Sequence, residues 1–195
     1  MAKSAVFVDR DDTLIADVGY CKDPDRVQLL PGVVEGLQRL SRAGMAIIVV
    51  TNQSGLGRGV FTEDDLSAVH ARLRSELEAS GVGLRAIYYC PHLPEDNCSC
   101  RKPRPGLLLK AASEMDLNLK TCFMIGDREL DLLAGRAAGT RTILVSKEVQ
   151  ERADVERIAD FVVKNLVEAA SVILNQSKNP VTREDFGSGD WSESL

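Results

Sequence analysis

The sequence lacks several features that mark whole classes of protein. No apolar run approaches the ~20 residues that a membrane-spanning helix needs. Basic residues are not in excess, because 24 Lys and Arg stand against 29 Asp and Glu, which gives a formal net charge of −5. A general nucleic-acid binder needs an excess of positive charge to displace counterions. We therefore expect a protein with neither membrane nor nucleic-acid partners.

Signal-peptide and linker features are also missing. The N-terminal residues lead directly into a short apolar run, which is too short for a secretion signal. The 195 residues suit a single domain, and the 44% of hydrophobic residues can fill a core. We expect a cytoplasmic monomer with one domain over residues 1–175. Residues 176–195 are rich in Ser, Asn, Gly and acid, which is typical of a flexible tail.

Two kinds of apolar segment alternate along the chain. Short β-branched runs predict buried strands, and apolar residues three and four positions apart predict helices. The predicted strands are residues 5–8, 46–50, 86–89, 122–125, 142–145 and 161–163. The predicted helices are residues 33–43, 63–80, 106–115, 130–138 and 166–174. This alternation predicts an α/β fold, a Rossmann-like three-layer sandwich with a mainly parallel sheet.

Polar side chains follow three of the predicted strands. Asp9 and Asp11 come directly after the first strand, Thr51 after the second and Asp127 after the fourth. Lys102 lies between them in the chain. In open α/β sheets, ligands bind beyond the carboxyl ends of the strands, so we expect these side chains to share one crevice.

Phosphoryl transfer to an aspartate needs this set of groups. A carboxylate that attacks phosphorus must overcome the repulsion between two anions, which Mg²⁺ on carboxylate oxygens and a lysine both reduce. A second acid must protonate the leaving oxygen and then deprotonate the water that cleaves the acyl phosphate. Hydroxyl and backbone donors must hold the phosphoryl oxygens. The sequence therefore favours a site for phosphate chemistry.

Four motifs together resemble those of the haloacid dehalogenase (HAD) superfamily of phosphatases. They are Asp9-x-Asp11-x-Thr13, Thr51, Lys102 and Gly126-Asp127, in this order and each at the expected strand end. The resemblance covers about residues 1–165 and implies a HAD core. No inserted cap domain fits, because the core elements and one cysteine-rich loop account for all of the residues between the motifs.

The resemblance also implies roles for these residues. Asp9 would be the nucleophile and Asp11 the general acid and base. Mg²⁺ would be bound by Asp9, the backbone carbonyl of Asp11 and the carboxylate of Asp127, while Thr51 and Lys102 hold the phosphoryl group. Asp131 is interpreted either as a helix-surface acid or as a group near the metal. Asp12 stands where the family usually has glycine and adds negative charge near the metal.

Three of the five cysteines fall within eleven positions and form an array with a histidine. Cys90, His92, Cys98 and Cys100 offer three thiolates and one imidazole, which fill a tetrahedral zinc and predict a structural Zn²⁺ in the loop 90–100. A disulfide or free thiols are the alternatives. The other histidine, His70, is expected to face solvent from its helix.

The zinc loop resembles two related HAD groups, the heptose 1,7-bisphosphate 7-phosphatases and the histidinol-phosphatases. The shortness of the loop matches the second group, whereas several other segments match the first, which we favour. The resemblance implies that substrate contacts come from Asp17, Val18, Gly19, Tyr20, Thr51, Asn52, Gln53, Ser54, Arg101, Lys102 and Arg128. Arg101 would recognise the sugar or its second phosphate. Arg128 stands where the heptose group has a lysine beside the metal-binding aspartate.

The predicted function is thus a Mg²⁺-dependent phosphomonoesterase with a structural zinc, acting on a sugar bisphosphate in the synthesis of nucleotide-activated heptose for lipopolysaccharide. Histidinol phosphate is the alternative substrate. A non-enzymatic phospho-acceptor module is the alternative from another class, because receiver domains also place acids, a hydroxyl and a lysine at parallel strand ends. Asp11 and the zinc loop argue against it.

Overall fold

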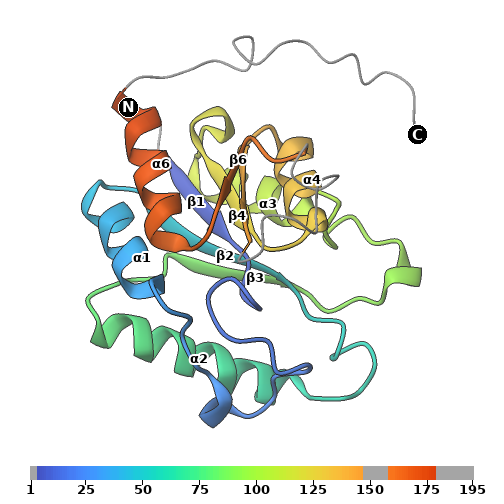
Figure 1. The fold of residues 1–195 in the computed structure, drawn as a ribbon. Coiled ribbons are helices and arrows are strands. Elements are labelled where there is room, and N and C mark those ends of the chain that lie inside the picture. The colour runs from blue at the N-terminus through green and yellow to red at the C-terminus, as the bar shows by residue number, and fades with distance from the viewer. Residues whose placement is uncertain (1–3, 147–157, 179–195) are drawn as a thin grey trace.

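The structure is a computed structural model, and it describes residues 4–146 and 158–178. Six parallel strands form one sheet with the order β3-β2-β1-β4-β5-β6 (Figure 1). The strands are β1 (Ala5–Val8), β2 (Ala46–Asn52), β3 (Ala86–Cys90), β4 (Phe123–Gly126), β5 (Arg141–Val145) and β6 (Phe161–Val163). The predicted α/β sandwich is therefore confirmed.

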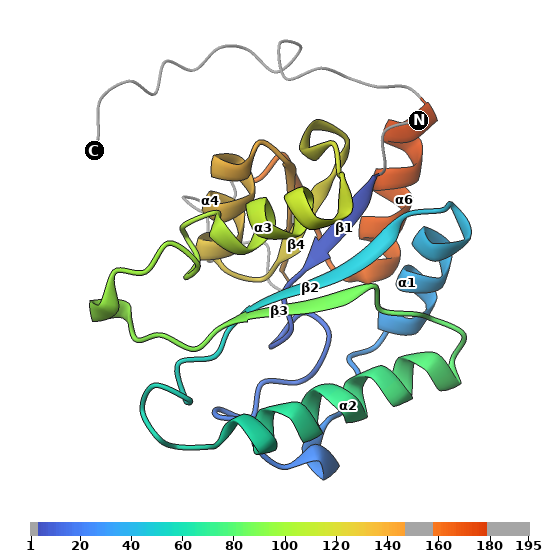
Figure 2. The same ribbon diagram turned by 180° about the vertical axis from the view of Figure 1, so that it is seen from behind.

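Helices cover both faces of the sheet (Figure 2). Those on one face are α1 (Val33–Arg42), α2 (Glu63–Ala79) and α6 (Leu166–Lys178), and those on the other are α3 (Gly106–Met115) and α4 (Glu129–Ala138). Short 3-10 turns at Pro24–Arg26, Pro94–Asp96 and Leu119–Thr121 interrupt the loops.

The central strand β1 shows why the strand sequences are apolar throughout. Val6 and Val8 pack into the cluster beneath α1, α2 and α6, while Ala5 and Phe7 pack into the cluster beneath α3 and α4. Successive side chains of a strand point to opposite faces, and both faces are covered here. All four residues have no solvent exposure.

Local signals set the helix ends close to where the sequence predicts them. The Thr62 hydroxyl accepts a hydrogen bond from the Asp65 N–H, and the Asp65 carboxylate accepts one from the Thr62 N–H, so α2 begins with a capping box. β2 runs two residues further than predicted, because Thr51 and Asn52 still pair with β3.

The C-terminal helix α6 extends to Lys178, beyond the predicted end at residue 174. The rest of the predicted tail, 179–195, lies outside the described residues, so the division of the chain at residue 175 stays a prediction. Between β1 and Lys102, the described loops contain two short 3-10 turns and no inserted domain. Among residues 4–146 and 158–178, no helix has the length and apolar character needed to cross a membrane.

Candidate active site

The carboxyl ends of β1 and β4 bring two aspartates together. Asp9 follows β1 directly, and its N–H donates to the Ile125 carbonyl of β4, 2.9 Å away, so the two strands still pair at this point. Asp127 follows β4 and lies 3.4 Å from the Thr13 hydroxyl. Both aspartates are buried. The parallel pairing of neighbouring strands therefore explains why residues more than a hundred positions apart share one site.

Lys102 reaches the same point from a loop. Its ammonium lies 2.5 Å from Oδ1 of Asp9, 2.5 Å from Oδ1 of Asp131 and 2.9 Å from the Val50 carbonyl. Its backbone is held by Asn52, whose side chain accepts from the Lys102 N–H and donates to the Lys102 carbonyl, both at 3.1 Å. The last residue of β2 thus positions the lysine.

Asp131 is a buried member of this cluster, which decides between the two interpretations of the sequence. It lies in the first turn of α4, where its Oδ2 accepts from the Arg128 N–H at 3.1 Å. Gly126 leaves the room that the Asp131 carboxylate occupies, since a Cβ at position 126 would collide with it. The helix start and the adjacent glycine therefore direct this carboxylate inward.

The charges of the cluster do not balance. Asp9, Asp127 and Asp131 are buried with carboxylate oxygens within 4.8 Å of one another, and Lys102 supplies one positive charge among them. Burial and the Asp9 charge raise the pKa of Asp127 to about 6, and burial raises the pKa of Asp131 to about 7 despite Lys102. Burial alone would lower the pKa of Lys102, but the two adjacent carboxylates raise it.

This excess of negative charge suits a divalent cation. Mg²⁺ prefers oxygen ligands and is bound in proteins through one or two carboxylates, and Asp9 and Asp127 offer such a pair. A cation would offset the cost of burying three carboxylates beside the Lys102 ammonium and the more exposed Arg128 guanidinium. The donor set therefore fits the magnesium that the sequence predicts, with Asp131 held mainly by Lys102.

Asp11 is held from two sides at the pocket. The Arg10 guanidinium donates to both of its carboxylate oxygens at 2.9–3.1 Å. The Gln53 amide donates to Oδ2 at 2.9 Å and to the Thr51 hydroxyl at 2.8 Å. Burial raises the pKa of Asp11 even though Arg10 opposes this. Gln53 therefore links the second-strand hydroxyl to the predicted acid and base.

These groups line a pocket of about 310 Å³. Its lining includes the predicted residues Asp9, Asp11, Asp17, Gly19, Tyr20, Thr51, Asn52, Gln53, Ser54, Arg101, Lys102 and Arg128. Val18 does not belong to the lining and packs against the hydrophobic core instead. Leu130 and Asp131 are part of the lining that sequence reasoning did not assign to the substrate.

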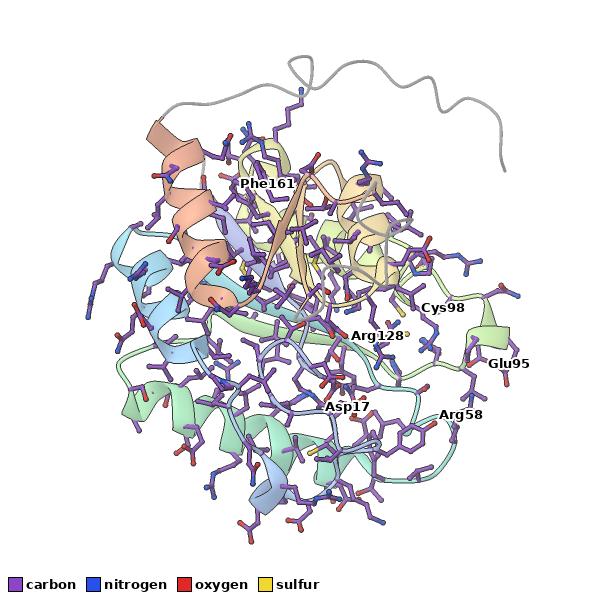
Figure 3. The ribbon with its side chains drawn as sticks, in the orientation of Figure 1. Asp17, Arg58, Glu95, Cys98, Arg128 and Phe161 are labelled. Carbon is purple, nitrogen blue, oxygen red and sulfur yellow. The ribbon has the colours of Figure 1, made fainter. Side chains whose placement is uncertain are left out.

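The pocket lining includes two arginines, Arg101 and Arg128. The Arg128 guanidinium lies 3.3 Å from Asp17 and 3.6 Å from Asp127, and Figure 3 shows Asp17 and Arg128 close together at this edge of the sheet. Arg101 donates to the His92 carbonyl at 3.2 Å, so its guanidinium is tied to the cysteine-rich loop. Both arginines retain donors that can bind an anion.

The cysteine-rich loop brings the four predicted zinc ligands together. The sulfur atoms of Cys90, Cys98 and Cys100 lie 3.3–3.5 Å apart, and Nδ1 of His92 lies 3.2 Å from Cys100 and 3.5 Å from Cys90. Ligand atoms about 2.3 Å from a tetrahedral zinc are separated by about 3.7 Å, which is close to these spacings. The donor set fits zinc, and all five cysteines are free of disulfides.

Two residues next to the site were missed or misplaced by sequence reasoning. Arg10 was not singled out, yet it is 1% exposed. His70, predicted to face solvent, is half-buried, and its ring turns inward: its Nε2 lies 3.3 Å from Nη1 of Arg10, and the ring lies 5.8 Å from that of Tyr89. The signal was available, because His70 is four residues after the buried Leu66 and thus borders the apolar stripe of α2.

A protein-family model described as HAD-hydrolase-like matches residues 99–169 of the chain. A D-glycero-beta-D-manno-heptose-1,7-bisphosphate 7-phosphatase from Pasteurella multocida (strain Pm70) is 39% identical over 178 residues, which cover 88% of this chain and 97% of that protein. The protein of the same name from Escherichia coli (strain K12) is 37% identical over 188 residues, 91% of this chain and 98% of the relative.

A solved structure of a heptose bisphosphate phosphatase also matches the chain. The crystal structure of D,D-heptose 1,7-bisphosphate phosphatase from B. bronchiseptica, complexed with magnesium and phosphate, superimposes with a TM-score of 0.79 at 33% identity. The match covers 89% of this chain and 99% of that chain.

Proposed function

Since the chain belongs to the HAD superfamily of phosphatases, in the branch of the heptose 1,7-bisphosphate 7-phosphatases, we propose that it hydrolyses the 7-phosphate of D-glycero-D-manno-heptose 1,7-bisphosphate. The observation that carries the proposal is that Asp9, Asp11 and Lys102 all line one pocket. The relatives are named for this sugar, which favours it over histidinol phosphate. Its product would serve the synthesis of nucleotide-activated heptose.

The first chemical step forms a bond between Asp9 and phosphorus. A carboxylate oxygen of Asp9 attacks the 7-phosphoryl group, and the bond from phosphorus to the sugar oxygen breaks. Asp11 gives its proton to that oxygen, so the sugar leaves as an alcohol. The Lys102 ammonium beside Asp9 lowers the repulsion between the carboxylate and the phosphoryl oxygens.

The second step restores the free enzyme. Asp11, now a carboxylate, takes a proton from water as the water attacks phosphorus, and the bond between phosphorus and Asp9 breaks. Inorganic phosphate leaves, and Asp11 keeps the proton for the next cycle. Thr51, the residue before the last of β2, and backbone donors hold the phosphoryl oxygens through both steps.

We assign the Mg²⁺ ligands to Asp9, the Asp11 carbonyl and Asp127, and the zinc ligands to Cys90, His92, Cys98 and Cys100. Bound Mg²⁺ would neutralise the charge that builds up on the phosphoryl group. These four zinc ligands would leave no open position on a tetrahedral ion, which favours a structural role for that site.

The remaining pocket residues would select the sugar. Arg101 and Arg128 belong to the lining, where a second phosphate of the substrate would meet positive charge. Tyr20 and Leu130 are partly exposed in the lining and offer apolar surface to the carbon face of a sugar ring. We further propose that the enzyme is a cytoplasmic monomer, as its small-metabolite substrate does not require a second chain.

A phosphate-release assay tests the proposal. The parent is measured with heptose 1,7-bisphosphate, as both anomers, and with histidinol phosphate, each with and without Mg²⁺, beside Asp9→Asn. We expect Mg²⁺-dependent release with kcat/KM at least tenfold higher for the heptose ester, and no turnover by Asp9→Asn. A higher kcat/KM for histidinol phosphate would reject the substrate. Release by Asp9→Asn equal to that of the parent would reject the mechanism.

A further inference from the structure

The buried arginine next to the proposed acid and base has no role in the mechanism above. Arg10 is 1% exposed, and its guanidinium binds both carboxylate oxygens of Asp11 through Nε and Nη2. Such a fork fixes the carboxylate in direction as well as in distance, since two parallel donors must be matched. A single buried charge is costly unless it is paired, so Arg10 is committed to Asp11.

The far side of the guanidinium is fixed by α2. Nη1 of Arg10 lies 3.3 Å from Nε2 of His70, which can accept the hydrogen bond when the ring is neutral. Burial and the Arg10 charge lower the pKa of His70 to about 3, so the ring is neutral at ordinary pH. The ring in turn contacts Tyr89 on β3.

The position of Arg10 follows from the strand. Val6 and Val8 point to the face of the sheet that α2 covers, and the alternation of side chains carries Arg10 to the same face. Asp11 points the other way, into the pocket, where Gln53 meets it. The guanidinium therefore reaches Asp11 from behind the pocket and does not itself line it.

We propose that Arg10 is a positioning residue for Asp11, which it holds by its two-point contact at one place in the pocket, with His70 fixing the guanidinium from α2. This proposal rests on the proposed function, because it needs Asp11 to donate the proton to the leaving oxygen. Proton transfer demands a short contact with the substrate oxygen, and an error of about 1 Å can cost about 100-fold in rate.

The test uses two esters that differ in their need for a proton. The phenolate of p-nitrophenyl phosphate leaves with little protonation, whereas the alkoxide of a sugar phosphate cannot leave without it. For Arg10→Met we expect kcat/KM to fall about 100-fold with the sugar phosphate and less than about fivefold with p-nitrophenyl phosphate. A general loss of folded enzyme would lower both values by the same factor, and equal losses overturn the proposal.

A second background shows whether Arg10 acts through Asp11. In Asp11→Asn, the further change Arg10→Met should leave kcat/KM for p-nitrophenyl phosphate within about twofold, because the group that Arg10 positions has gone. Arg10→Lys keeps the buried charge without the fork, and we expect it to lose at least tenfold with the sugar phosphate. Arg72→Met, an α2 arginine paired with Asp25 and Glu76, is the matched control and should change neither ester.

A direct view separates this proposal from the proposed function. Crystal structures of the parent and of Arg10→Lys should differ in the direction of the Asp11 carboxylate, with or without turnover. An Asp11 carboxylate that keeps its place in Arg10→Lys would overturn the positioning role even if the enzyme proves to be a heptose bisphosphatase. His70→Leu should move Arg10 and lower kcat/KM for the sugar phosphate by a smaller factor, and no change in either would reject the part assigned to His70.

Discussion

The Lys102 ammonium lies 2.5 Å from the Asp9 carboxylate across 93 positions of sequence. The contact depends on two supports: Asn52 holds the Lys102 backbone, and the cysteine-rich loop ends two residues before it. The lysine is 3% exposed and the aspartate 7%. In such surroundings the removal of Lys102 leaves the Asp9 and Asp131 carboxylates buried without the ammonium that contacts both of them.

Replacement of this lysine should therefore damage both stability and rate. We expect Lys102→Met to lower the free energy of unfolding by about 3 kcal/mol, and to reduce kcat at least 100-fold because the positive charge at the phosphoryl group is lost. Urea denaturation and steady-state kinetics measure the two effects. Lys110→Met, whose ammonium is exposed and 4.0 Å from Glu114, is the control and should change neither. Retention of parent kcat by Lys102→Met would contradict the assigned role.

Loss of the proposed zinc ligands should loosen the loop that carries Arg101 and Lys102. We expect the double variant Cys98→Ser/Cys100→Ser to retain less than about a tenth of the bound zinc, because two of four ligands are gone. Its melting temperature should fall and its KM should rise, as Arg101 is tied to the His92 carbonyl. Metal analysis by mass spectrometry gives the zinc content. Cys21→Ala alters a buried thiol outside the array and should keep full zinc; equal zinc in both variants would reject the site.

His70 should make the fold sensitive to acid. Its pKa is about 3 in the folded chain, lowered by burial and Arg10, against 6.5 as the ordinary value. The unfolded chain binds the proton more readily, so this contribution to stability is complete above pH 6.5 and is lost as the pH falls towards 3. When the pH is lowered from 7 to 5, the free energy of unfolding should fall in both proteins. The fall should be larger in the parent than in His70→Gln, by about 2 kcal/mol at most. Urea denaturation at the two pH values measures this difference, and identical losses would show that His70 is accessible to protons in the folded state.

The residue that replaces the family glycine should be tolerated with a small strain. Asp12 has φ +56°, in the left-handed region, and its carboxylate accepts from the Asp17 N–H at 3.1 Å. Asp12→Gly removes the strain and the hydrogen bond together, so we expect the free energy of unfolding to change by no more than about 0.5 kcal/mol. Asp12→Ala keeps the strain and loses the bond, and should cost about 1–2 kcal/mol. Thermal denaturation compares the two; a more stable Asp12→Ala would refute this explanation.

Much of the fold was predictable because its signals are local. Apolar runs long enough for one strand each, separated by helical periodicity, specify parallel strands between helices, and the parallel arrangement alone gathers the residues after β1 and β4 at one edge. The capping pair of Thr62 and Asp65 set the start of α2 as predicted. The cysteine array was recognisable because its ligands are neighbours in the chain.

The sequence by itself determined the layers of the fold, the strand ends that carry Asp9 and Asp127, and the residue types of the cysteine-rich loop, since each depends on spacing along the chain. Only the tertiary structure decided which distant side chains contact each other. In the folded chain Lys102 contacts Asp131, Asn52 binds the backbone of Lys102, and Arg10 and His70 point inward and contact each other. Such pairings depend on the packing of distant segments, because a buried charge must find its partner wherever the fold brings one within reach.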